Sequence, residues 1–93
     1  MEIRQNGNII EVDGVIKTIT DSQQLVDAIQ AASTNGSVII KINDSFSLPS
    51  TVIGKLLKMK DGGVKISLEV KDEILYELLD DLNLIEAFNV RKV

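Results

Sequence analysis

The sequence has 93 residues, a formal net charge of −4 and 44% hydrophobic residues, which suffice for the core of one small domain. It contains no cysteine and no histidine, which excludes disulfides, zinc sites, cysteine nucleophiles and Ser-His-Asp triads. The negative charge and the scarcity of aromatic residues argue against nucleic acid as a partner.

The N-terminal pattern predicts a β-hairpin. Residues 8–12 form a short apolar run, and residues 15–19 form a second one. Asp13-Gly14 lies between them, and Asp-Gly between apolar runs is a strong hairpin signal.

The next segment predicts an amphipathic helix. Thr20 to Gln23 fits a capping box, with a hydroxyl at the cap and Gln three residues later. The apolar residues that follow at helical spacing are Leu25, Val26, Ile29 and Ala32. Residues 33–36 should end the helix, with Asn35 or Gly36 in the left-handed conformation.

The middle of the chain predicts a strand, a turn and a second helix. The Val-Ile-Ile-x-Ile run of Ser37–Ile42 indicates a central strand covered on both faces or nearly so. The helix is marked by Val52, Ile53, Leu56, Leu57 and Met59, with Lys55, Lys58 and Lys60 on its polar side. Asp61-Gly62-Gly63 should end it.

The C-terminal third predicts a strand, a third helix and an edge strand. Residues 64–70 alternate strictly between apolar and polar. Asp72 can cap the helix, and Asn83 can end it in a left-handed conformation. Its apolar stripe comprises Ile74, Leu75, Leu78, Leu79 and Leu82. Residues 89–93 read as the last strand.

The order β-β-α-β-α-β-α-β predicts an α/β fold in one domain, residues 1–93. Strand-helix-strand alternation requires parallel pairing, and the hairpin makes the single sheet mixed but mostly parallel. In so short a chain, the helices should pack mainly on one face. No apolar run approaches the ~20 residues of a membrane span, and residues 1–5 lack signal-peptide features. We therefore expect a cytoplasmic protein without direct membrane insertion.

The hydroxyl turn, residues 44–51, joins the central strand to the second helix and is the main functional candidate. It contains Ser45, Ser47, Ser50, Thr51 and the only proline, Pro49. A helix start can hold an anion, so a serine there suits a phosphoryl switch, and equally a simple N-cap.

Other features of this region also have two readings. Phe46 either anchors a partner or packs beneath the loop, and we favour the second. Ser45 and Ser47 are more simply solvated turn residues. The lysines at 55, 58 and 60 either face an acidic partner or form a solvated helix face, and Asp80-Asp81 are surface charges rather than a metal site.

Two segments resemble the STAS family, the domain of anti-sigma factor antagonists and of sulphate-transporter tails. The family places Asp-Ser-Ser-Gly-Leu-Gly at a helix start, where this chain has Pro49-Ser50-Thr51-Val52-Ile53-Gly54. The two hydroxyls, the apolar residue and the last glycine match, whereas the acidic residue and the first glycine do not. The segment 70–79 followed by Asn83-Leu84-Ile85-Glu86-Ala87-Phe88 is similar to the family's final helix and its Gly-Leu-x-x-x-Phe ending.

The resemblance implies a non-enzymatic regulatory module that needs no cofactor, catalytic residue or metal. Its partner would be an anti-sigma factor with serine-kinase activity, and Ser50, with Thr51 as second candidate, would accept the phosphoryl group. The partner-binding surface would comprise Ser45, Phe46, Ser47, Pro49, Ser50, Thr51 and Lys55. The resemblance also allows a constitutive subunit of a lipid-transporter ATPase. We expect a monomer or a weak homodimer.

Overall fold

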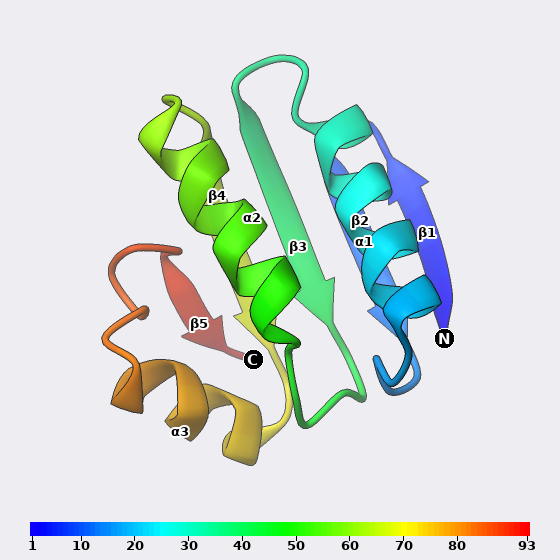
Figure 1. Ribbon diagram of the computed structural model, residues 1–93. Coiled ribbons are helices and arrows are strands. Elements are labelled where there is room, and N and C mark those ends of the chain that lie inside the picture. The colour runs from blue at the N-terminus through cyan, green and yellow to red at the C-terminus, as the bar shows by residue number, and fades with distance from the viewer.

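The computed structural model describes all residues, Met1 to Val93, as one mixed sheet with three helices (Figure 1). In chain order the elements are β1 (Glu2–Asn6), β2 (Ile9–Asp13), α1 (Ile19–Ala32), β3 (Ser37–Ile42), α2 (Ser50–Asp61), β4 (Lys65–Val70), α3 (Glu73–Asp81) and β5 (Val90–Lys92). The predicted element order is therefore confirmed.

The strands lie in the sheet in the order in which they occur in the chain. β1 pairs antiparallel with β2, and the pairs β2–β3, β3–β4 and β4–β5 are parallel. Each helix links two neighbouring parallel strands, and each crossover advances in the same direction. Because such crossovers are right-handed, the helices fall on one face of the sheet, where α1 and α2 lie side by side (Figure 1).

The hairpin exists, but the prediction placed it one strand too late. The turn is formed by Gly7 and Asn8, with Gly7 in the left-handed region at φ 62°, and β1 precedes it. Gly14, at φ 88°, instead directs the chain out of the sheet toward α1. Residues 15–18 form no strand.

The first helix also begins earlier than predicted. Thr18, rather than Thr20, is the N-cap, and its Oγ1 accepts a hydrogen bond of 2.9 Å from the backbone N–H of Asp21. The Asp21 carboxylate accepts in return from the N–H groups of Lys17 and Thr18. These bonds lower the pKa of Asp21, with the Lys17 N–H as the largest cause. The helix ends as predicted, with Gly36 in the left-handed conformation at φ 86°.

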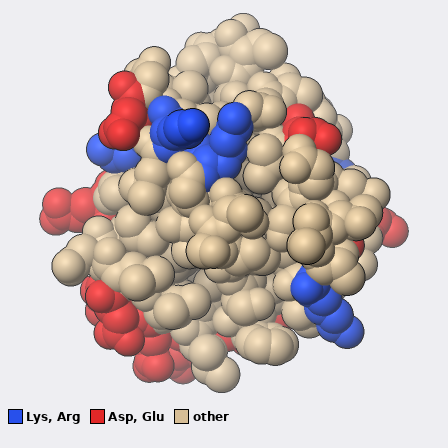
Figure 2. Space-filling model, in the orientation of Figure 1, with Lys and Arg blue, Asp and Glu red and all other residues tan.

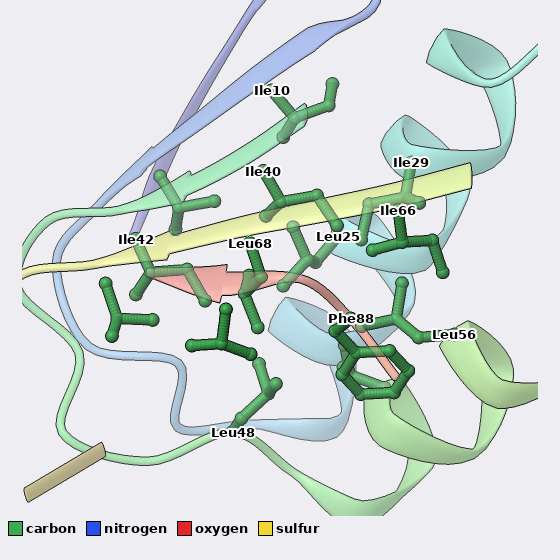
Figure 3. Close-up of a cluster of buried hydrophobic side chains, with 14 of the residues drawn as sticks. Ile10, Leu25, Ile29, Ile40, Ile42, Leu48, Leu56, Ile66, Leu68 and Phe88 are labelled. Carbon is green, nitrogen blue, oxygen red and sulfur yellow. The ribbon is translucent and has the colours of Figure 1, made fainter. Parts of the chain in front are cut away.

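The core lies between the helices and one face of the sheet (Figure 3). In β3, buried Val38, Ile40 and Ile42 alternate with residues that are only half-buried. The prediction that both faces of this strand are covered is therefore wrong. Lys41 is one of the half-buried positions. The second face of the sheet carries charged side chains and is not covered by a further layer of helices.

The uncovered face is crossed by a row of alternating charges. The register pairs Arg4 with Glu11, Glu11 with Lys41, Lys41 with Glu69, and Glu69 with Arg91, one residue from each strand. Opposite charges at directly opposed positions stabilise a sheet and keep its outer face hydrated. We call this set the charge row.

The other predicted helix ends agree with the structure. Asp72 caps α3 by accepting from the Leu75 N–H at 3.1 Å, and Asn83 follows the helix at φ 59°. Asn89 is also left-handed, at φ 47°, and its side chain donates to the Ile66 carbonyl at 2.8 Å. None of the three helices is both long and apolar enough to cross a membrane.

Candidate functional site

The hydroxyl turn lies at the carboxyl end of β3, between that strand and α2. It packs against the segment that joins β2 to α1. Gly14 N–H donates to the Asp44 carboxylate at 2.8 Å, and Ile16 N–H donates to the Ser45 hydroxyl at 3.3 Å. These two bonds connect loops about thirty residues apart in sequence and fix the shape of the turn.

Ser45 belongs to the interior and not to the expected partner surface. It is completely buried, its hydroxyl donates to the Ser47 carbonyl at 2.7 Å, and it accepts from the Ile16 N–H. The placement of Ser45 on the binding surface, and its reading as a solvated residue, are therefore wrong. A buried hydroxyl with these partners has a structural role, because it joins the turn to the β2–α1 segment.

Phe46 points outward, against the expectation that it packs beneath the loop. The side chain is 52% exposed, whereas its neighbour Leu48 is buried and reaches the core (Figure 3). Ile19, at the start of α1 on the adjoining segment, is 90% exposed. Burial of Ser45 and Leu48 leaves Phe46 exposed between them, and an exposed aromatic ring of this kind suits an anchor for a protein partner.

Pro49 and Ser50 form the start of α2. Pro49 occupies the N-cap position, at φ −58°, and its carbonyl accepts from the N–H groups of Val52 and Ile53. Proline offers no side-chain acceptor, so α2 begins with no side-chain cap. Its first turn also contains no acidic residue. The first amides of the helix therefore lack a side-chain acceptor.

Ser50 and Thr51 are the first two residues of α2, and both are exposed. The Ser50 hydroxyl does not cap the helix. Ser50 is therefore not the N-cap, and the structure agrees both with a plain surface serine and with a phosphoacceptor. Any charge placed on it would lie at the positive end of the helix dipole.

The remaining residues of the expected surface differ in accessibility. Ser47, Pro49 and Lys55 are half-buried. Lys58 and Lys60 are exposed in the last turn of α2, where they favour the helix dipole. Figure 2 shows a group of basic side chains over the far half of this helix. Of the residues expected on the partner surface, the structure thus exposes Phe46, Ser50 and Thr51, and it buries Ser45.

Asn43, which the sequence did not single out, joins the turn to the charge row. Its side-chain amide donates to Glu11 at 2.8 Å and to Asp13 at 2.7 Å. Arg4 forms ion pairs with the same two carboxylates, at 3.2 and 2.7 Å. The Asn43 bond is the main reason that the pKa of Glu11 is lowered, and Asp13 is the main reason that the pKa of Arg4 is raised.

The site is an exposed helix start and not a cavity. The shallow pockets of the surface are lined by residues of the β1–β2 region and of the C-terminal third, and none includes a residue of the hydroxyl turn. No group of three or more acidic side chains is arranged to hold a metal ion.

Comparison with known proteins found no matching family model, no matching curated protein and no matching solved structure.

Proposed function

We propose that this chain is a non-enzymatic, protein-binding regulatory module of the STAS type, switched by phosphorylation of Ser50. The observation that carries the proposal is the exposed Ser50 at the start of α2, a helix without a side-chain cap, four residues after the exposed Phe46 in the same turn. An apolar anchor next to a modifiable hydroxyl is an arrangement in which one phosphoryl group can control binding.

Two features support the STAS type. The first is a single mixed sheet whose parallel strands follow chain order, with a hydroxyl pair at the helix that leaves the central strand. The second is the ending after α3, where Asn83 adopts a left-handed backbone at the position of the family's glycine and Phe88 is fully buried.

The chemistry of the switch follows from the position of Ser50. A phosphoryl group adds about −1.5 to −2 charges at neutral pH, and the uncapped amides of α2 would stabilise it. The same charge would lie on the surface segment that also carries Phe46, whose burial by a partner requires an apolar, dehydrated contact. Phosphorylation should therefore release the partner, which we propose is an anti-sigma factor with serine-kinase activity.

The alternative is a constitutive subunit of a larger assembly, such as a lipid-transporter ATPase. Pro49 favours it, because this position carries an acidic residue in the switch proteins that the chain resembles. In that case the same exposed surface binds continuously, and phosphorylation plays no part.

The switch can be tested by incubating the purified chain with ATP and a lysate of its native cells, followed by peptide mass spectrometry. We expect one phosphoryl group on the peptide that contains Ser50. Ser50→Ala should abolish the modification, whereas Thr51→Ala should retain it. Absence of phosphate from both residues would refute the switch and favour the constitutive subunit.

A further inference from the structure

Helix α3 presents an apolar row to solvent. Ile74 and Leu78 of the helix and Leu82, its C-cap, follow one another at intervals of four residues, and their exposed fractions are 65%, 38% and 50%. Leu75 and Leu79 of the same helix are fully buried against the sheet. One side of α3 thus packs into the core, and the exposed row forms a second apolar strip next to that buried side.

A row of carboxylates lies next to this strip. Glu73, Glu77 and Asp81 are exposed and repeat at the same interval, each one residue before a member of the apolar row. Like charges four residues apart destabilise a helix by about 0.2–0.5 kcal/mol per pair. Acidic residues in the last turn also oppose the helix dipole, and this turn has no basic residue. Glu73 lies in the first turn, where it favours the dipole, but the stability of α3 itself does not explain Glu77 and Asp81.

The acidic residues are concentrated in this region. Residues 72–86 contain six carboxylates and no basic residue, while the rest of the chain has eight acidic and ten basic residues. The net negative charge therefore resides entirely on α3 and its flanks, and Figure 2 shows it as a patch away from the lysines of α2.

We propose that α3 is a second docking surface, and that it binds a basic amphipathic helix of another protein. Ile74, Leu78 and Leu82 would receive the apolar face of that helix, and the carboxylate row would face its lysines or arginines. The α3 helix of a second copy would oppose acids to acids, so charge disfavours it as the occupant. This inference does not depend on Ser50.

The test uses the full chain and a synthetic helical peptide of leucine and lysine, with leucines every three or four residues. A matched peptide carries glutamate in place of lysine. Binding is measured by fluorescence anisotropy, and backbone amide NMR shifts locate the peptide on the protein. We expect the lysine peptide alone to bind, with the largest shifts in residues 73–82.

Two variants separate α3 from the rest of the surface. Leu78→Gln should weaken binding about tenfold, as removal of an interface anchor does, because Gln retains the helix but not the apolar contact. Leu57→Gln changes an exposed leucine of α2 and should leave the affinity within about twofold. Retained secondary structure in both variants is verified by circular dichroism.

Any of several results would overturn the proposal. The peptide experiment would do so through no binding of the lysine peptide, equal binding of both peptides, an affinity that Leu78→Gln leaves unchanged, or NMR shifts confined to other elements. Self-association of the free chain that Leu78→Gln abolishes would identify a second copy as the occupant and would also refute it. Sedimentation equilibrium measures that property directly.

Discussion

Lys41 of β3 lies directly opposite Glu69 of β4 on the face of the sheet that carries no helices. Lys41 also faces Glu11 on its other side, so it is the centre of the charge row. Cross-strand pairs of opposite charge contribute about 0.2–1 kcal/mol each, and like charges at these positions are destabilising.

Lys41→Glu should therefore lower the free energy of unfolding by roughly 0.5–2 kcal/mol, since it places three carboxylates in a row. Lys65→Glu is the matched control, because it makes the same charge change on β4, opposite the uncharged Ser37. Urea denaturation measures both variants. Equal losses would show that net charge, and not register, governs the effect.

Ser45→Ala should destabilise the protein by about 1–3 kcal/mol, because the Ile16 N–H would lose its buried acceptor. The adjacent hydroxyl of Ser47 forms no such bridge to the β2–α1 segment, so Ser47→Ala should stay within about 0.5 kcal/mol. Thermal and urea unfolding would reveal the difference. An unchanged free energy of unfolding for Ser45→Ala would contradict the structural role of this hydroxyl.

The position of the first helix cap can be tested with two threonines. Thr18→Ala removes the acceptor for the Asp21 N–H and should cost about 0.5–2 kcal/mol of stability. Thr20→Ala changes a residue inside the first turn and should have no such cost, because alanine favours the helix. The reverse ranking in denaturant titrations would restore Thr20 as the cap.

Stability should decrease in acid partly through Glu11. Its pKa is lowered in the folded protein, chiefly by the bond from Asn43, so its contribution is complete above the ordinary value of 4.5. The contribution is lost as pH falls through the lower, folded value. Denaturation at pH 3 to 6 should show a shallower acid decline for Glu11→Gln and for Asn43→Ala. An unchanged slope in both variants would refute this assignment.

The sequence predicted the elements that depend on local pattern, and it failed where distant residues decide. Local pattern alone predicted α2 and α3 from their apolar spacing. It also predicted the Asp72 cap and the left-handed Asn83. Gly7-Asn8 and Asp13-Gly14 are both hairpin signals, and only the pairing of β1 with β2 decides between them.

The candidate site shows the same division. Ser45 and Ser50 are both hydroxyls of one turn, yet the first is buried because Ile16, far away in sequence, donates to it. Phe46 is exposed because Leu48 takes the place in the core that the turn offers. The charge row was hidden for a related reason, since alternation within one strand does not reveal its register with the next.

The central claim is that the exposed start of α2 binds a protein partner and that charge on Ser50 controls this binding. The most direct measurement is quantitative capture from a native lysate by the wild-type chain, Ser50→Ala and Ser50→Asp. We predict that a serine kinase of the anti-sigma type is retained by the wild type and by Ser50→Ala and is lost by Ser50→Asp. Equal capture of a transporter ATPase by all three proteins would contradict the switch.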